Sequence, residues 1–303
     1  MIKRTLVFGS PGTLRLRDRQ LVWTDRAGEE TTVPIEDIGF VLLESPLATC
    51  SVALLQALAD ANAAVAVCDA RHIPSAYLLP IADHTLAERH LQDQIACSEA
   101  RANRLWRQIV QAKIRNQARA AAAISREASA AIAAFAERVK NGDPDNVEGQ
   151  AAHVYFPLFR ERWPAFDARH TDAMPNPALD YGYALLRAAV ARALVSSGLH
   201  PSLGLHHHNQ YNPFCLADDV MEPFRPFVDR LVILHSDELP PKNADEPPRL
   251  SPAEKRILLP LLAMDVRIGD VVRPLMNAVS QTTASLVRAF RGEQDALELP
   301  VFP

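Results

Sequence analysis

The sequence changes character near residue 84, and this change limits the folds that the chain can adopt. Before it, short segments, several of which alternate polar and apolar residues, are separated by turn residues, a pattern typical of strands with tight turns. The expected strands are residues 2–9, 13–17, 20–24, 30–35, 38–43, 64–68 and 75–79, with one helix at 50–62. After it, long stretches are rich in alanine, arginine and glutamine, which favour helices.

The second part of the chain is expected to be helical throughout. Helices are predicted within residues 84–139, from residue 147, and over 178–197, 216–234 and 252–291, with an exposed proline-rich loop at 236–250. The fold class is therefore predicted as α+β multidomain: a small β-sandwich-like domain at residues 1–85, followed by a larger all-α domain at residues 86–303.

Composition excludes several classes of protein. Apolar residues make up 48% of the chain, enough for a substantial core, and the formal charge of −4 argues against a uniformly basic surface. The four cysteines are scattered without a CxxC pair, so neither a zinc site nor a disulfide framework is indicated, and a reduced, cytoplasmic setting is expected. No uncharged run approaches the roughly 18 residues of a membrane helix, and the N-terminus lacks the apolar stretch of a signal peptide.

Residues 203–229 concentrate groups that bind metal ions. The segment holds three successive histidines, His206 to His208, in a stretch whose glycine and asparagines indicate a loop, followed by Asp219 and Glu222. On a helix these two carboxylates lie one turn apart on one face, within reach of one cation. Imidazole with carboxylates indicates Mn²⁺ or Mg²⁺, with Mn²⁺ favoured by the nitrogen ligand. The alternative is that the histidines are only polar loop residues and that Glu222 caps or pairs on its helix.

A basic stretch lies between residues 99 and 140. It contains nine basic residues and three acidic ones: Arg101, Arg104, Arg107, Lys113, Arg115, Arg119, Arg126, Arg138 and Lys140 against Glu99, Glu127 and Glu137. The first three arginines recur at three-residue spacing and share a helix face, which suits a DNA phosphate backbone. A solvated helix face is the alternative.

Glu148 has two interpretations. Asp145 followed three residues later by Glu148 resembles a capping box, in which the glutamate only satisfies a backbone N–H. Gly149 is costly in the first turn of a helix, which indicates close approach of a neighbouring group or a ligand.

No GxSxG, P-loop, strand-linked GxGxxG or HExxH motif is present, so none of the corresponding catalytic classes is indicated.

Four motifs occur together in one order along the chain. They are NVEGQAA at 146–152 with YF at 155–156, LDYGYALLR at 179–187, GLHP at 198–201 with LGLHH at 203–207, and LADDVMEPFRP at 216–226. In these motifs the sequence resembles the integrase of CRISPR adaptation, CRISPR-associated protein number one, and it is most similar to the forms from type II systems, which contain Cas9. The resemblance covers essentially the whole chain.

The resemblance implies a catalytic site and an assembly. Its metal ligands, which are also its catalytic residues, match Glu148, His207 and Glu222, with Asp219 as an auxiliary carboxylate and Tyr181 and Arg225 as supporting residues. For Arg225, pairing with Asp219 or Glu222 remains an equal alternative. The DNA-binding residues are expected to be Arg101, Arg104, Arg107, Lys113 and Arg115. One departure is visible, since Asp180 stands where asparagine is expected before the Tyr-Gly-Tyr, and its role is open.

The implied reaction joins 3′-hydroxyl ends of spacer DNA to a CRISPR repeat by transesterification, with Mg²⁺ or Mn²⁺ as cofactor. The implied partners are double-stranded DNA, a second copy of the chain bound through the N-terminal domains, and the small second CRISPR adaptation protein. Because a histidine ligand must be neutral, activity is expected to fall at acidic pH. Two other functions remain: a stand-alone metal-dependent nuclease on branched or double-stranded DNA, and a non-catalytic DNA-binding scaffold.

Overall fold

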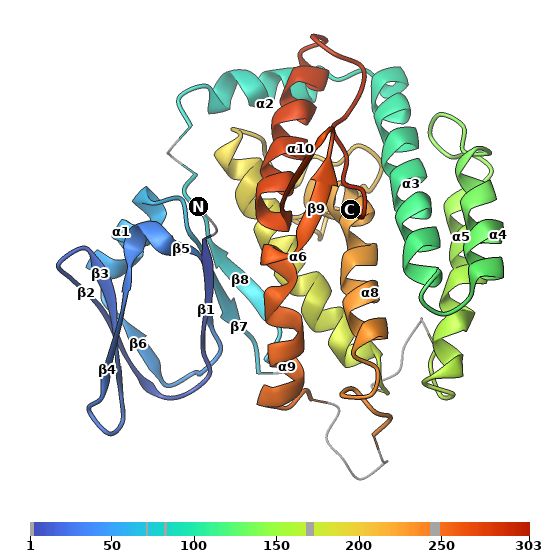
Figure 1. Ribbon diagram of the computed structural model, residues 1–303. Helices are drawn as coiled ribbons and strands as arrows, with labels where there is room; N and C mark the ends of the chain where they lie inside the picture. Colours follow the sequence, from blue (N-terminus) through green and yellow to red (C-terminus); the bar gives the residue numbers. More distant parts are fainter. Residues whose placement is uncertain (1–2, 71, 82–83, 168–172, 243–248) are drawn as a thin grey trace. The chain divides into compact units, whose positions relative to one another are not determined.

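The computed structural model describes the whole chain except residues 1–2, 71, 82–83, 168–172 and 243–248. It divides into two compact units, Met1–Thr85 and Leu86–Pro303. Strands form the first unit and helices most of the second, so the α+β class is confirmed (Figure 1). Part of the loop expected at 236–250 lies outside the described residues.

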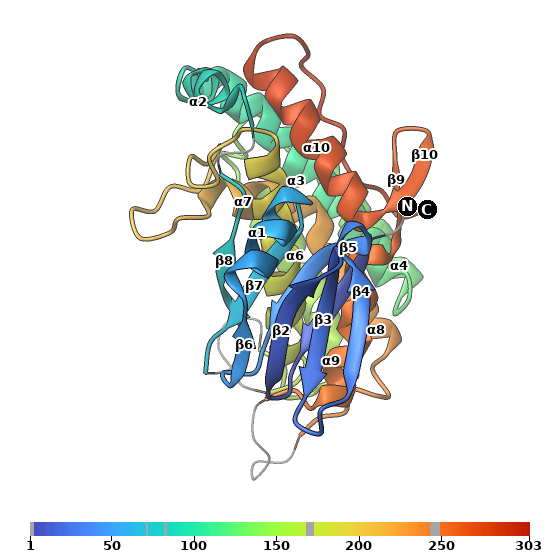
Figure 2. The ribbon, with the colours of Figure 1, turned by 90° about the vertical axis from the view of Figure 1, so that its left-hand side faces the viewer.

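The first unit contains two four-stranded sheets. The first sheet has the order β1-β5-β7-β8, formed by β1 (Arg4–Phe8), β5 (Ile38–Leu43), β7 (Ala64–Cys68) and β8 (Pro74–Leu78). The second sheet has the order β4-β3-β2-β6, formed by β4 (Glu30–Pro34), β3 (Gln20–Asp25), β2 (Gly12–Arg17) and β6 (Ala48–Cys50) (Figure 2). In the first sheet β1, β5 and β7 run parallel and β8 antiparallel, whereas β2, β3 and β4 form an antiparallel meander.

Both sheets and helix α1 (Val52–Asp60) share one hydrophobic core. Leu14 and Leu21 from the meander lie in it with Val41 from the first sheet and Leu54 from the helix, and each of the four is at most 1% exposed. The helix connects β6 of the second sheet to β7 of the first, and Ser51 caps its first turn by accepting the N–H of Leu54.

The second unit is a helical body with one small sheet. Its helices are α2 (Ala87–Ile95), α3 (Glu99–Ala121), α4 (Arg126–Ala136), α5 (Val147–Tyr155), α6 (Asn176–Ser196), α7 (Cys215–Met221), α8 (Arg225–Leu234), α9 (Pro252–Leu258) and α10 (Leu275–Phe290). Short 3₁₀ turns η2 (Phe156–Glu161), η3 (Glu222–Phe224) and η4 (Leu259–Ala263) join some of them. Helix α6 is central, since it packs against α7, α8, α9 and α10 and is buried along most of its length.

The expectation of an all-α second domain is wrong at residues 265–274. There β9 (Asp265–Ile268) and β10 (Val271–Pro274) form an antiparallel hairpin, labelled in Figure 2, inside the stretch predicted as helix 252–291. The physical reason is local: β-branched residues lie on both sides of a two-residue turn, and Gly269 adopts a φ of +57° there. In the described part of the chain, no helix has both the length and the apolar character needed to cross a bilayer.

Candidate active site

Glu148 lies in the first turn of α5, but its side chain does not cap that helix. The N-cap is Asn146, whose side chain accepts the N–H of Gly149 at 3.1 Å, while Asp143 accepts the N–H of Glu148 at 3.0 Å. The capping box expected for Asp145 is therefore absent. Gly149 is explained by the same cap, because a Cβ there would overlap the Asn146 side chain. With its backbone satisfied by others, the Glu148 carboxylate is free for other contacts.

Glu222 begins the short turn η3 and is 5% exposed. Arg225, one turn later, places its Nε 3.0 Å from Glu222 Oε1, and its guanidinium lies over the Tyr183 ring at 4.7 Å. Burial raises the pKa of Glu222, but the positive charges of Arg225 and Lys113 outweigh it and hold the pKa below its usual value. Glu222 is therefore an ionised, buried carboxylate. Of the alternatives for Arg225, pairing with Glu222 is the one observed.

The C-terminal end of the chain supports the backbone beside Glu222. Asn116 in α3 is 1% exposed and donates both to the carbonyl of Pro223, at 2.8 Å, and to that of Pro300, at 2.9 Å. Two residues on, Phe302 stacks on Phe227 with ring centroids 4.0 Å apart. A buried amide thus links α3, the start of η3 and the C-terminal end.

His207 is oriented by Asp219, which is fully buried in α7. The Asp219 carboxylate accepts the backbone N–H groups of Leu205, His206 and His207 at 2.6 to 3.2 Å, and its Oδ1 lies 2.6 Å from His207 Nδ1. Gly204 makes this turn possible, since a Cβ there would collide with the carboxylate and with the His207 carbonyl. Because Nδ1 is bonded to Asp219, His207 presents Nε2 to the rest of the site.

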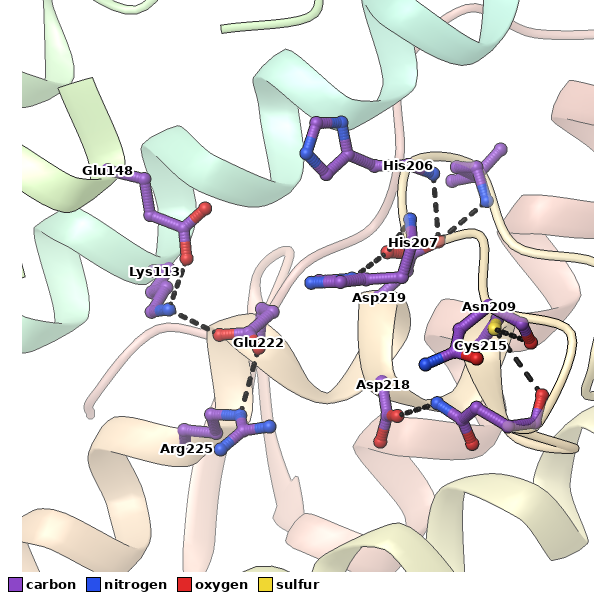
Figure 3. Close-up of polar contacts among 12 residues, drawn as sticks. Lys113, Glu148, His206, His207, Asn209, Cys215, Asp218, Asp219, Glu222 and Arg225 are labelled. Atoms are coloured by element: carbon purple, nitrogen blue, oxygen red, sulfur yellow. Dashed lines mark hydrogen bonds and ion pairs between the residues drawn. The ribbon is translucent and has the colours of Figure 1, made fainter. Parts of the chain in front are cut away.

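The three histidines have different surroundings. The His206 ring stacks on the Trp106 ring of α3, with centroids 4.3 Å apart and an interplanar angle of 2°. His207 meets the same indole edge-on, with centroids 5.6 Å apart. His208 is exposed. Of the two histidines labelled in Figure 3, His207 is the one directed toward Glu222. Its pKa is raised by the hydrogen bond to Asp219, against the opposing effect of burial.

Lys113 lies between the two glutamates. Its ammonium is paired with Glu148 Oε1 and lies 2.5 Å from Glu222 Oε2, so helices α3 and α5 and the turn η3 meet at this point (Figure 3). Burial lowers the pKa of Lys113, but the charges of Glu222 and Glu148 raise it above its usual value. Lys113 is therefore a cation at neutral pH, in contact with two of the predicted metal ligands.

The predicted ligands of this site are of types that bind divalent cations. Two carboxylates and an imidazole nitrogen are a ligand set for Mn²⁺ or Mg²⁺. Glu222 Oε2 is buried and, although close to Lys113, receives no aligned hydrogen bond. In the described part of the chain, no three histidine, cysteine or acidic side chains are gathered closely enough to hold a metal ion. Instead, Glu148 and Glu222 flank a position that the Lys113 ammonium occupies.

Comparison with known proteins identifies the family. The family model "CRISPR associated protein Cas1" matches residues 6–244. The chain is also 38% identical over 287 residues to the CRISPR-associated endonuclease Cas1 of Neisseria meningitidis serogroup C (strain 8013), which covers 94% of this chain and 91% of that protein. The chain belongs to the Cas1 family.

Solved structures share the Cas1 fold. A casposase bound to an integration product is similar with a TM-score of 0.78 at 18% identity, over 98% of this chain and 93% of the casposase. A Cas6-RT-Cas1–Cas2 complex is similar with a TM-score of 0.72 at 18% identity, over 98% of this chain and 36% of the longer one. At such identities the likeness concerns the fold alone.

The basic residues of this Cas1 protein differ in their contacts. The residues expected to bind DNA were Arg101, Arg104, Arg107, Lys113 and Arg115. Arg101 donates to the carbonyl of Phe290 at 3.1 Å, at the end of α10, and Lys113 is held by the site glutamates. Arg115 is half exposed and pairs with Glu137. The other two arginines of the set make no ion pair within the described part of the chain.

Tyr183, which was not among the predicted site residues, contacts Arg225 beside Glu222. Tyr181 lies two positions away in α6 and is buried with the Lys255 ammonium over its ring at 5.7 Å. Tyr183 instead stacks with Arg225 and donates a hydrogen bond to Asp229. The Cas1 motif contains both tyrosines, so the spacing alone did not distinguish them. Asp180, the departure from the motif, is exposed.

Asp229 gives this Cas1 protein a pH-dependent stability. The carboxylate is 1% exposed and accepts the hydroxyls of Tyr155 and Tyr183, and burial raises its pKa to about 6. Because the folded-state pKa lies above the unfolded value of about 3.9, this group stabilises the fold at low pH, and that stability is lost as pH rises through 6. Between pH 4.5 and 7.5 the loss is about 2 kcal/mol.

The test is urea unfolding of wild type and Asp229→Asn at both pH values. The variant cannot ionise, so its stability relative to wild type is expected to improve by about 2 kcal/mol on going to pH 7.5. Asp237→Asn, which changes an exposed carboxylate paired with Arg162, serves as the control and should show no such change. The prediction is contradicted if Asp229→Asn changes the free energy of unfolding by the same amount at both pH values.

Proposed function

We propose that this protein is the DNA integrase of CRISPR adaptation, which joins the 3′-hydroxyl ends of a short DNA duplex to phosphodiesters at the edges of a CRISPR repeat. Three findings support the proposal. The chain belongs to the Cas1 family, its Neisseria relative is named an endonuclease, and a protein of the same fold is bound to an integration product.

The observation that carries the proposal is the convergence of Glu148 and Glu222 on one cationic position, with His207 oriented toward it by Asp219. Transesterification uses the DNA 3′-hydroxyl as nucleophile, so it needs no nucleophile from the protein. It does need neutralisation of phosphate charge and alignment of the reacting groups. Glu148, His207 and Glu222 would hold Mg²⁺ or Mn²⁺, which would polarise the scissile phosphate and stabilise developing charge on oxygen.

The remaining residues act by positioning. Asp219 fixes the tautomer and orientation of His207. Arg225 forms an ion pair with Oε1 of Glu222, whose Oε2 lies at Lys113. Arg104, Arg107 and Arg115 are the proposed contacts to DNA phosphates, which position the duplex without reading its sequence.

The proposed assembly contains two copies of the chain and the small second CRISPR adaptation protein. Dimerisation is assigned to the N-terminal unit, as the family resemblance implies. The partner proposal is supported by the Cas1–Cas2 composition of a complex that shares this fold. Size-exclusion chromatography with light scattering, on the chain alone and with its partner, measures both steps.

The proposal is tested by integration into a supercoiled plasmid that carries CRISPR repeats. The assay contains the full chain, the second adaptation protein, Mg²⁺ or Mn²⁺, and a labelled duplex with free or blocked 3′ ends. Covalent joining that requires the free 3′-hydroxyl and is abolished by a chelator is the expected result. Plasmid cleavage that is indifferent to 3′ blocking would instead indicate a nuclease, and DNA binding without any metal-dependent product would indicate a scaffold.

A further inference from the structure

Lys113 has a position that its place in a basic helix does not explain. Its side chain is 13% exposed, and its ammonium touches carboxylates that lie 35 and 109 residues away in sequence, on Glu148 and Glu222. A lysine that binds DNA phosphates is expected to extend into solvent. This lysine extends into the proposed catalytic site (Figure 3).

The charges at this point cancel one another. Glu148 and Glu222 carry two negative charges, and Lys113 and Arg225 carry two positive ones. Lys113 contacts both glutamates, and Arg225 contacts Glu222. Leaving a buried carboxylate without a cation is strongly unfavourable, so Lys113 stabilises the pair of glutamates. A divalent ion entering between them would meet the ammonium at contact distance, where like charges repel. The ammonium and a metal ion therefore exclude each other.

Lys113 and Arg225 bind Glu222 differently. Arg225 lies at Oε1 and is itself held over the Tyr183 ring, so it forms part of a packed support. Lys113 lies at Oε2 and has no aromatic ring beneath it in the described part of the chain. Neither Arg225 Nε nor Glu222 Oε2 has an aligned hydrogen bond to a described residue, so both contacts are ion pairs. The ammonium also ends a flexible four-carbon chain, which can withdraw without moving the backbone.

We propose that Lys113 is the resident counter-ion of the catalytic site, which holds Glu148 and Glu222 together in the metal-free protein and is displaced when a divalent metal ion binds. The inference rests on the proposed function, because it takes these glutamates as metal ligands. It adds that metal binding is an exchange of one cation for another. The protein thus keeps its ligands in place before metal arrives, and its metal affinity is lowered by the ammonium that must leave.

The first test measures Mn²⁺ binding to the full chain by electron paramagnetic resonance of the free ion. Lys113→Met is expected to bind Mn²⁺ roughly tenfold or more tightly than wild type, because the competing charge is gone. Lys113→Arg, which keeps the charge, is expected to bind no more tightly than wild type. Lys242→Met is the matched control, since Lys242 is also 13% exposed and paired with a glutamate, and it should leave the affinity unchanged.

Equal or weaker Mn²⁺ binding by Lys113→Met overturns the inference. Glu148→Gln separates this failure from failure of the proposed function. If wild type binds Mn²⁺ and Glu148→Gln does not, the metal site stands and only the role of Lys113 is wrong. If Glu148→Gln binds as wild type does, or wild type binds no Mn²⁺, the proposed metal site fails, and the inference fails with it.

A second measurement uses the wild-type chain and does not depend on the folding of a variant. The sequence contains only five lysines, so acetylation by an N-hydroxysuccinimide ester can be followed at each one by mass spectrometry. Lys113 is expected to be protected without metal and acetylated severalfold faster with saturating Mn²⁺, while the other four lysines are unaffected. An acetylation rate of Lys113 that does not change with Mn²⁺ overturns the inference.

Discussion

Glu148→Gln is expected to reduce DNA end joining by roughly 1000-fold while leaving the fold intact, because a Lewis-acid metal site contributes several kcal/mol to the transition state. Glutamine keeps the size of the side chain but removes the charge that holds a divalent cation. The helix is not expected to suffer, since its N-terminus is capped by Asn146 and Asp143 and not by Glu148. The measurement is the rate of joined product formation at saturating DNA.

Glu137→Gln is the matched control for this experiment. Glu137 is a mostly exposed carboxylate paired with Arg115, and its loss is expected to change the joining rate less than twofold. Filter binding of the DNA duplex should be nearly the same for wild type and Glu148→Gln. If the Glu148→Gln protein joins DNA at the wild-type rate, Glu148 is not a catalytic residue.

Asp219→Asn is expected to weaken Mn²⁺ binding and end joining by about 100-fold, the upper range for a residue that orients a metal-ligating histidine. The carboxylate accepts a hydrogen bond from His207 Nδ1–H, so the neutral ring has its free lone pair on Nε2. An asparagine amide placed there donates to Nδ1 instead. The ring proton then moves to Nε2, and the nitrogen that faces the glutamates can no longer bind a metal ion.

Nitrogen-15 NMR of the histidine rings distinguishes this mechanism from simple loss of structure, because it reports which ring nitrogen carries the proton. Asp218→Asn is a control on the same helix: Asp218 is also buried, but it accepts from Arg187 and Asn212 and does not touch His207. It should leave the His207 tautomer unchanged. An Asp219→Asn protein with the wild-type tautomer and weak Mn²⁺ binding would contradict the explanation.

The fold was predictable where the pattern is local. Most strands of the first unit follow from short segments between turns, and the long helices follow from runs of strong helix formers. The short strand β6 at Ala48–Cys50 was not predicted. The hairpin at residues 265–274 was missed because it lies between helical segments, although its Gly269-Asp270 turn between β-branched residues is a recognisable signal. The parallel pairing of β5 with β1 and with β7 joins segments far apart in sequence, which no local pattern specifies.

The residue types of the site could be predicted from the sequence, but the hydrogen bonds and ion pairs between them could not. Glu148 reads as a cap because Asp145 stands three residues before it, and only the structure shows that Asn146 takes that role. From the sequence, Lys113 was one of several basic residues on a helix. Its ion pairs with Glu148 and Glu222 join residues far apart in sequence, so no local pattern could indicate them. The assignment of the metal ligands came from resemblance to the family and remains a prediction.

The stacking of Trp106 against His206 and His207 supplies the site with an optical reporter. Indole emission responds to the charge and distance of an adjacent imidazole, and here both loop histidines touch one buried ring. The chain has only two other tryptophans: Trp23 packs against Phe8, and Trp163 packs against Phe159. Changes at His207 can therefore be followed in real time by intrinsic fluorescence, in the unlabelled protein and before any DNA is added.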